Sequence, residues 1–524
     1  MAEDTARRAE TTAPGGAGVP ADGEEPGSLV SPPLRSDSLG TLLGPRREKD
    51  MLRPYDIVVG LEVHCELRTA TKLFCGCRNA FGDEPNTNVC PVCLGLPGSL
   101  PVLNRQAVEY AMAVGLALSC EVRPSLFHRK NYFYPDMPKD YQVSQYDQPI
   151  NVDGHLDLPD GSVVGIERAH LEEDTGKSSH VGGGGGRIHG ADHSLVDYNR
   201  AGVPLVEIVS RPDIRSATQA VDYVRELRSI LVTTGASDGK MEEGSLRVDA
   251  NVSVRPAGSD TLGTRCEIKN LNSLRSLGRA IDHEASRQWD LLETGERIVQ
   301  ETRHWNEDLG RTIPGRSKEE AYDYRYFPEP DLVPLAPDDD WRDRVLAAIP
   351  MLPAARRARL SEATGVDTAL AATVVELDLD TLVLAAVSAK ADGRRAVNRA
   401  VNEVAADLDA ARRLDPAAFT KLLLLEDKGK LTATQAKQVL AELLAGGGDP
   451  EDIAAARGFE ALADDALAGA VDTAIAANPA EWERFIAGDA KVTGFFVGQV
   501  MRASGGKADG KAVTALLRER AAAG

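Results

Sequence analysis

Hydrophobic and polar residues alternate strictly from residue 61 to residue 67, early in the chain. Successive side chains of a β-strand point to opposite faces, so this alternation predicts a strand with two different faces. One face is apolar and is predicted to be buried, with Leu61, Val63, Cys65 and Leu67. The other face carries groups that can bind cations, namely Glu62, His64 and Glu66.

Three further segments have related patterns and extend the predicted sheet. Residues 245–255 and 265–271 alternate between apolar and polar side chains, and residues 203–210 form a mostly apolar segment that carries Glu207. Together they predict an antiparallel sheet with one buried face and one charged face, which carries Arg247, Asp249, Glu267 and Lys269. Two interpretations of the charged face stay open: a functional site, or an ordinary solvated outer face.

The pattern changes after a proline-rich stretch at residues 327–337. From there to the end, apolar residues recur at helical spacing and the strand-like alternation disappears. We predict an α+β domain over residues 54–340, a helical domain over 341–419 and a helical tail domain over 420–524. Residues 1–53 are rich in Ala, Gly, Pro, Ser and Glu without hydrophobic periodicity, which predicts a disordered extension.

Four cysteines follow the first predicted strand in two close pairs, Cys75 with Cys77 and Cys90 with Cys93. This spacing allows the loops to offer four thiolates to one tetrahedral Zn²⁺. Four thiolates leave no open coordination position, which makes the predicted zinc structural and disfavours a zinc hydrolase. Seven cysteines in 524 residues are too few for a disulfide scaffold, which favours a reducing, cytoplasmic location.

Length and composition narrow the class of protein. A chain of 524 residues is too long for one ordinary core and is typical of about three domains. Its 42% hydrophobic and 27% charged residues are typical of a soluble protein, and no apolar run approaches the roughly 20 residues of a membrane span. The net charge of −20 argues against nucleic-acid binding over the whole surface, because phosphates need local positive charge.

The last 35 residues or so differ from this acidic average. They carry more basic than acidic side chains, among them Lys491, Arg502 and Lys507. This local positive charge makes the tail the best candidate for contacts with a phosphate backbone, although a short basic helical end is more often simply solvated.

Two segments between the predicted strands are ambiguous from the residues alone. The aromatic residues 132–134 follow Arg129 and Lys130, and they suit either a cradle for a base and a phosphate or the edge of a core. The acidic residues 172–174 fit either a hard cation such as Mg²⁺ or an exposed turn. The Gly-Lys-Ser run at 176–178 is not a P-loop, because Leu171 stands where that motif needs glycine.

Several long motifs resemble one family, the B subunit of the bacterial glutamyl/aspartyl-tRNA amidotransferases, in that family's order from about residue 55 to the end. No single motif is as specific as the set. The motifs are residues 60–64 (GLEVH), 129–136 (RKNYFYPD), 172–178 (EEDTGKS), 240–247 (KMEEGSLR), 267–273 (EIKNLNS), 323–331 (DYRYFPEPD) and 494–504 (GFFVGQVMRAS).

The resemblance implies a cradle-shaped catalytic domain similar in fold to glutamine synthetase and guanidino kinases, then a helical domain and a tRNA-binding tail. It implies that ATP phosphorylates the side-chain carboxylate of Glu on tRNA(Gln) or of Asp on tRNA(Asn), and that ammonia then displaces phosphate. Phosphorylation turns a poor leaving oxygen into a good one, while Mg²⁺ and basic side chains neutralise the phosphates.

The resemblance also implies roles for individual residues. Catalysis and Mg²⁺ binding fall to Glu62, His64, Glu172 and Glu267, with Asp249 a weaker Mg²⁺ ligand. Phosphate binding falls to Lys130, Arg247 and Lys269. The four cysteines match the zinc-bearing branch of the family, and the tail that carries Lys491, Arg502 and Lys507 corresponds to the family's tRNA-binding tail.

Partners are implied as well. Nothing in the chain resembles the Ser-Ser-Lys apparatus that makes ammonia from glutamine, so we expect a separate amidase A subunit and a small C subunit in a heterotrimer. The alternative is a non-catalytic tRNA-binding scaffold whose acidic face holds structural ions. A scaffold has no need of Arg247, Asp249, Glu267 and Lys269 together, which favours the enzyme.

Two residues depart from the family pattern. The family usually has glycine where Asp140 follows Lys139, and proline where Gly510 follows Asp509. We expect the first to alter a local loop and the second to touch the tail.

Overall fold

The computed structural model describes residues 55–182, 191–315, 324–459, 464–489, 491–504, 508 and 510–523. The extension predicted to be disordered lies outside these residues. The fold is mixed α/β, with a large mixed sheet followed by many helices. The strands are β1 (Tyr55–Glu66), β2 (Glu121–Val122), β3 (Leu126–Asn131), β4 (Tyr141–Gln148), β5 (Asn151–Asp157), β6 (Val163–Glu173), β7 (Lys177–Val181), β8 (His193–Asp197), β9 (Pro204–Ser210), β10 (Leu246–Pro256), β11 (Cys266–Leu271), β12 (Thr302–Asn306), β13 (Arg311–Pro314) and β14 (Phe327–Pro328).

Twelve strands form the large sheet, and β7 pairs with β8 in a separate hairpin. The main order is β13-β12-β11-β10-β1-β9-β6-β4-β3-β14; off this path, β5 pairs with β6 and β2 pairs with β5. The sheet was predicted to be antiparallel, and one pair corrects this: β11 and β12 run parallel. The chain passes through a long helix between these two strands, and such a crossover returns the second strand in the same direction as the first.

The predicted two-faced strand is present as β1. Leu61, Val63 and Cys65 are at most 1% exposed, whereas Glu62 and His64 are only half-buried on the opposite face. The predicted apolar face of residues 246–254 is likewise buried in β10. Burial of such side chains stabilises the sheet by roughly 1.5–3 kcal/mol each, and this fixes which side of the sheet the polar residues occupy.

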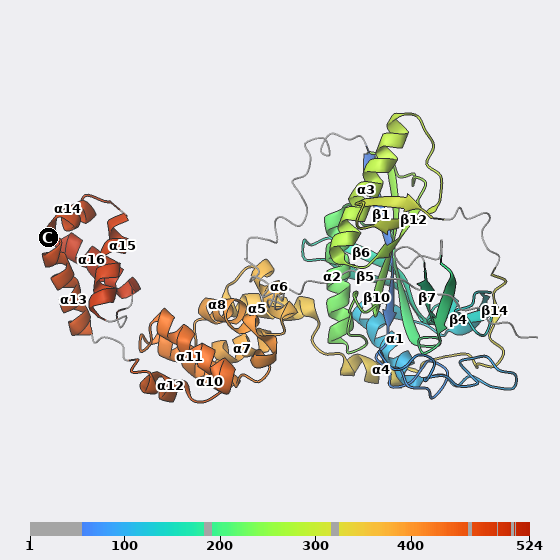
Figure 1. The fold of residues 1–524 in the computed structure, drawn as a ribbon, viewed down its shortest axis with the longest axis horizontal. Helices are drawn as coiled ribbons and strands as arrows, with labels where there is room; N and C mark the ends of the chain where they lie inside the picture. Colours follow the sequence, from blue (N-terminus) through green and yellow to red (C-terminus); the bar gives the residue numbers. More distant parts are fainter. Residues whose placement is uncertain are drawn as a thin grey trace, which may run out of the picture. The chain divides into compact units, whose positions relative to one another are not determined.

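Helices cover the apolar face of the sheet. They are α1 (Arg105–Ala117), α2 (Ala217–Thr233) and α3 (Leu274–Glu293), and α2 and α3 run side by side along it (Figure 1). Each begins at a polar residue whose side chain accepts hydrogen bonds from the first turn, namely Asn104, Ser216 and Ser273. Their apolar faces join β1, β6, β9 and β10 in one core, which leaves the polar face of these strands open.

The remaining helices follow from residue 339 onward. They are α4 (Asp339–Ala348), α5 (Pro353–Thr364), α6 (Thr368–Glu376), α7 (Asp380–Ser388), α8 (Gly393–Asn402), α9 (Leu408–Ala411), α10 (Pro416–Asp427), α11 (Ala433–Gly446), α12 (Pro450–Ala456), α13 (Asp464–Ala477), α14 (Pro479–Ile486), α15 (Lys491–Ala503) and α16 (Gly510–Ala523), with a 3₁₀ turn at Val404–Ala406.

These helices build two separate apolar clusters. One cluster gathers buried residues from Leu360 to Ala454, and the other gathers buried residues from Leu467 to Leu517. The boundary predicted at residue 419/420 falls inside the first cluster, because Phe419 and Leu422 of α10 are fully buried there.

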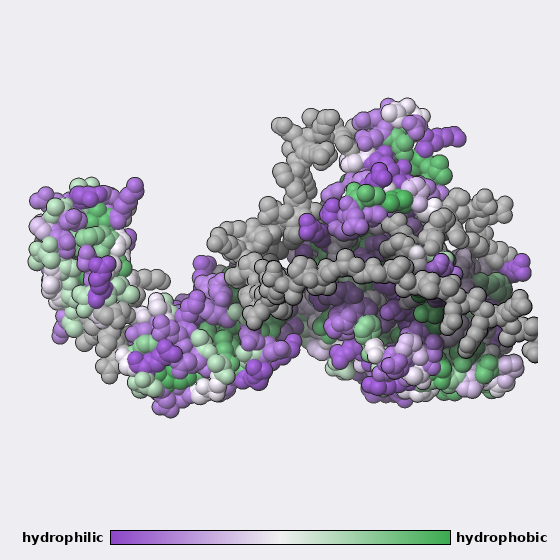
Figure 2. All heavy atoms as spheres, viewed as in Figure 1, coloured by the Kyte–Doolittle hydropathy of each residue, from purple (hydrophilic) through white to green (hydrophobic). Residues whose placement is uncertain are grey.

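The surface around α10 and α11 mixes hydrophilic and hydrophobic side chains (Figure 2). No helix within the described ranges combines the length and the apolar character that crossing a membrane requires.

The two departures from the family pattern fall at special backbone positions. Asp140 has a φ of 62°, the left-handed conformation that glycine adopts without strain and that aspartate tolerates better than most residues. Gly510 is the first residue of α16, a position that proline favours because its missing N–H has no helical partner there. Both departures therefore involve backbone conformation.

Candidate active site

A cavity of about 800 Å³ lies over the polar face of the sheet. Its walls come from strands far apart in the sequence, chiefly β1, β6, β9, β10 and β11. It brings together all but one of the charged residues predicted for catalysis, Mg²⁺ and phosphate: Glu62, His64, Lys130, Glu172, Arg247, Asp249 and Lys269. The exception is Glu267, which does not line the cavity.

His64 is the centre of an acidic group in this cavity. Its Nε2 lies 3.8 Å from Glu62 Oε1, 3.8 Å from Glu172 Oε1 and 3.4 Å from Glu207 Oε2. Glu62, His64 and Glu207 each place a ligand atom within 4.8 Å of the others, close enough to hold one metal ion. Carboxylate oxygens are the ligands that Mg²⁺ prefers.

Glu207 is the ligand candidate that the sequence patterns did not assign. It lies on β9, between β1 and β6, where pairing places it opposite His64 on one side and His170 on the other. It is 8% exposed. The signal in the sequence was a carboxylate within an otherwise apolar strand, but the strand register that gives it a partner is a long-range property.

His170 forms a second candidate group with Glu172 and Glu207, again with ligand atoms within 4.8 Å of one another. Its side chain is fully buried, and within the described part of the chain neither ring nitrogen has a hydrogen-bond partner. Burial lowers the pKa of His170 to about 4, which keeps the ring neutral near pH 7. A neutral, buried imidazole beside two carboxylates fits a site that holds a cation.

Burial and mutual proximity shift the pKa values of the ionisable groups in this cluster. Burial and then the nearby Glu207 raise the pKa of Glu172 to about 7. Burial opposes the charge of His64, but its hydrogen bond to Glu207 and the neighbouring carboxylates outweigh burial and raise its pKa to about 9. Without a cation this cluster therefore carries protons near neutral pH, and these are protons that a bound cation would displace.

Lysine and arginine side chains line the other side of the cavity. Lys269 Nζ lies 2.6 Å from Asp249 Oδ2 and 3.0 Å from Glu267 Oε1, so Glu267 acts on the cavity through Lys269. Thr302 Oγ1 donates a 2.7 Å hydrogen bond to Glu267 Oε2. Arg247 Nη2 donates a 2.8 Å hydrogen bond to Asp174 Oδ2, which holds the guanidinium at the cavity wall.

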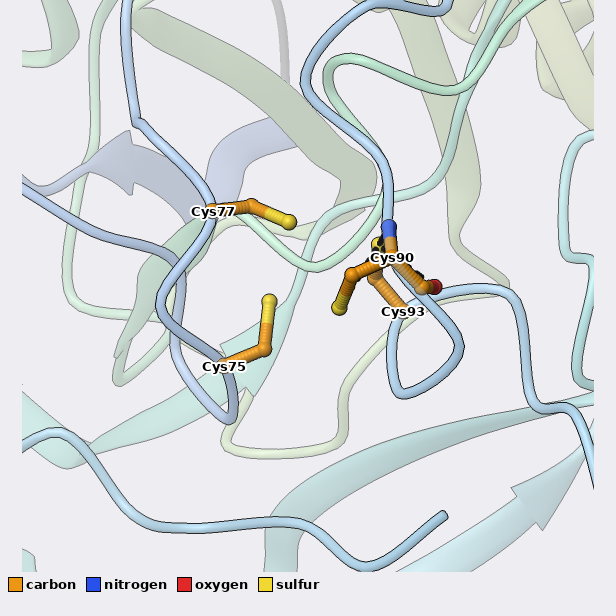
Figure 3. A group of neighbouring side chains, drawn as sticks. All are labelled: Cys75, Cys77, Cys90 and Cys93. Carbon is orange, nitrogen blue, oxygen red and sulfur yellow. Dashed lines mark hydrogen bonds between the residues drawn. The ribbon is translucent and has the colours of Figure 1, made fainter.

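The four paired cysteines converge, as their spacing predicts. Their sulfur atoms all lie within 4.8 Å of one another, and Cys75 and Cys77 face Cys90 and Cys93 from a separate loop (Figure 3). All four are free thiols. Backbone N–H of Cys90 donates to Cys93 Sγ at 3.1 Å, a contact typical of a thiolate ligand. The arrangement fits one tetrahedral Zn²⁺.

The predicted tRNA residues lie in the last helical cluster. Lys491 begins α15 and Arg502 lies near its end, both exposed. Lys507 lies outside the described residues.

Comparison with known proteins identifies the family. A family model described as the GatB/GatE catalytic domain matches residues 57–343, and one described as the GatB domain matches residues 381–520. The B subunit of the aspartyl/glutamyl-tRNA(Asn/Gln) amidotransferase of Frankia casuarinae is 52% identical over 487 residues, which cover 90% of this chain and 96% of that protein. The corresponding protein of Thermobifida fusca is 48% identical over 515 residues, covering 94% and 99%. The chain therefore belongs to the family of aspartyl/glutamyl-tRNA(Asn/Gln) amidotransferase B subunits.

Proposed function

We propose that this chain amidates Glu on tRNA(Gln), Asp on tRNA(Asn), or both, in an ATP-dependent reaction. The γ-phosphoryl group of ATP passes to an oxygen of the side-chain carboxylate, which gives an acyl phosphate and ADP. Ammonia then attacks the acyl carbon, and phosphate leaves with its electron pair. The observation that carries this proposal is the cavity in which lysine and arginine side chains flank an acidic cluster on both sides along the sheet.

The acidic side of the cavity is the proposed Mg²⁺ site. Glu62, His64, Glu172 and Glu207 would hold the ion, and His170 lies against the last two. Mg²⁺ bound there would neutralise phosphate charge as the phosphoryl group moves. Since imidazole is an unusual ligand for Mg²⁺, His64 is proposed to orient Glu207 and Glu172 or to act through a water molecule.

The basic side chains that flank the acidic cluster form the proposed phosphate site. Lys269 and Arg247 lie on β11 and β10 on one side of the cluster, and Lys130 lies on β3 on the other. Arg247 is held beside the cavity by Asp174. Asp249 and Glu267 fix the position of the Lys269 ammonium, so their proposed role is to position Lys269, with Asp249 still able to contact a cation. The acidic centre and the basic flanks of one cavity thus have different proposed tasks.

The match to the amidotransferase B subunits supports the finer expectations of the family resemblance. We propose that the sheet domain is a cradle related in fold to glutamine synthetase and guanidino kinases, and that the cysteine cluster holds a structural Zn²⁺. We also propose a heterotrimer, in which a separate amidase A subunit supplies ammonia and a small C subunit joins the two.

The experiment uses ammonia as nitrogen donor, because this bypasses the glutaminase. Glu172→Gln in the assembled complex should lower ammonia-dependent amidation of misacylated tRNA by at least about 100-fold, since a Mg²⁺ ligand contributes several kcal/mol. Glu293→Gln, an exposed carboxylate near the end of α3, is the matched control. If Glu172→Gln amidates at the wild-type rate, the acidic cluster has only a structural role, as the scaffold alternative requires.

The tail is proposed to bind the tRNA backbone. Replacing Lys491 and Arg502 together by Ala should weaken tRNA binding and reduce the slope of log affinity against log salt by about 1 for each phosphate that is no longer neutralised. Replacing two exposed lysines of the preceding cluster, Lys428 and Lys437, provides the matched control. An equal loss of affinity in both double variants would show that the tail has no special role.

A further inference from the structure

Five tyrosines cluster beside the cavity, and one of them, Tyr132, lines it. Tyr132 and Tyr134 stack with ring centroids 4.6 Å apart, and Tyr146 and Tyr326 stack at 5.6 Å. Tyr324 lies edge-on to Tyr326 at 6.0 Å. We call these residues the tyrosine ladder. The two stacked pairs have interplanar angles of 24° and 18°, so their faces are nearly parallel.

The ladder is built by three neighbouring strands. Tyr132 and Tyr134 directly follow β3, Tyr146 lies on β4, and the other two tyrosines precede β14, which pairs with β3. Asn131 fixes the last segment, because its backbone N–H and its side-chain amide both donate to the carbonyl of Tyr324, at 3.1 and 2.9 Å. The rings are therefore held by the sheet itself.

Core packing does not account for the ladder. Tyr134 and Tyr146 are each 48% exposed, and Tyr326 is 36% exposed. By contrast Phe74 and Phe127, an aromatic pair of the neighbouring core, are each 3% exposed. Ordered aromatic rings that stay partly exposed beside a cavity suit a ligand with flat rings.

The ladder is continuous with the active site. Tyr132 lines the same cavity as Glu172 and Lys130. The Lys130 ammonium lies 4.8 Å from the centre of the Tyr324 ring, and the Arg168 guanidinium lies 4.7 Å from that of Tyr146. Arg168 also lies 3.4 Å from Glu207, so cationic and acidic groups of the site stand directly beside the rings.

We propose that the tyrosine ladder stacks the unpaired bases at the 3′ end of the tRNA and so delivers the attached amino acid to the cavity. The inference rests on the proposed function, in which the reacting carboxylate hangs from that end. Bases of single strands stack on aromatic side chains without regard to sequence, and nearby cations serve their phosphates. The five rings extend from the end of β3 and from β4 to the segment before β14, a wider span than one adenine covers, which favours a run of nucleotides over ATP.

The test measures KM separately for misacylated tRNA and for ATP in the assembled complex, with ammonia as nitrogen donor. Tyr134→Leu and Tyr326→Leu should each raise KM for tRNA roughly 5- to 100-fold, the range expected for the loss of one stacked base, with KM for ATP unchanged. Tyr134→Phe and Tyr326→Phe keep an aromatic face and should restore KM. Phe81→Leu removes an exposed aromatic ring elsewhere and should have no effect.

The outcomes separate this inference from the proposed function. If the wild-type complex fails to amidate tRNA, the proposed function is wrong. If the wild type is active and the leucine variants keep its KM for tRNA, the ladder does not bind the tRNA end. A rise in KM for ATP instead would assign the rings to adenine and would also overturn the inference. Unchanged kinetics with ATP in the same variants show that they are folded.

Discussion

Two groups of candidate metal ligands in this chain are built in opposite ways. The cysteine cluster comes from two loops within 19 residues of sequence, and its sulfur atoms meet because the loops fold back on each other. The acidic cluster comes from β1, β6 and β9, and its members meet only because these strands lie next to one another in the sheet. One group is local in sequence, and the other depends on the whole fold.

The cysteine loops lie close to the end of β6, the strand that carries Glu172. Lys72 is completely buried near Cys93, and its ammonium donates to the carbonyl of Tyr198 at 3.0 Å. A Cβ on Gly202 would lie 3.7 Å from Cys93, from Lys72 and from Glu173, the neighbour of Glu172. The cysteine loops thus pack against the end of the strand that carries an acidic ligand, which suits a supporting role for a metal bound there.

The largest expected effect concerns the shared carboxylate. Glu207→Gln should lower ammonia-dependent amidation at saturating ATP by about 100-fold or more, because Glu207 belongs to both acidic groups and contacts His64. Glu267→Gln should lower it less, by roughly 10-fold, since Glu267 acts through Lys269. Zinc content should stay at the wild-type level in both variants.

Comparing the amidation rates of Glu207→Gln and Glu267→Gln tests this ranking. If Glu267→Gln has the larger effect, the catalytic cation lies beside β10 and β11, and the acidic cluster around His64 has another task. Glu293→Gln controls for the loss of one negative charge.

The same contrast explains what the sequence could and could not predict. Alternation placed Glu62 and His64 on the open face of β1, and paired spacing identified the four cysteines, because both signals are local. Glu207 was recognised only as a charge within an apolar strand, since nothing local says which strands flank it. The parallel pairing of β11 with β12 was missed for the same reason.

Loss of the zinc ligands should have a smaller effect on the chemistry. Cys90→Ser should remove the roughly one Zn²⁺ expected per chain and lower the melting temperature, because a structural zinc contributes to folding directly. Ammonia-dependent amidation should persist at temperatures where the variant remains folded, since no cysteine lines the cavity. Metal analysis, thermal melting and the ammonia assay measure the three effects.

The matched control is Cys120→Ala, which removes a buried cysteine outside the cluster. If metal analysis of the wild-type protein finds no zinc, the zinc proposal is wrong. Complete loss of amidation in folded Cys90→Ser would show that the local group takes part in the chemistry.

The smallest expected effect concerns Glu66, the last residue of β1. Burial and then the nearby Asp174 raise the pKa of Glu66 to about 8, and the two carboxyl groups share a hydrogen bond. An acid whose pKa is higher in the folded state than in the unfolded state stabilises the fold while it is protonated, and this stability declines as pH rises from about 4.5 through 8.

Glu66→Gln keeps a donor to Asp174 without the titration. In buffer without Mg²⁺ the melting temperatures of wild type and Glu66→Gln should therefore agree near pH 5 and diverge by several °C at pH 9, with the variant higher. Parallel melting curves across this pH range would show that Glu66 is ionised throughout, and that Arg247 and Arg200 compensate the paired carboxylates more fully than their burial suggests.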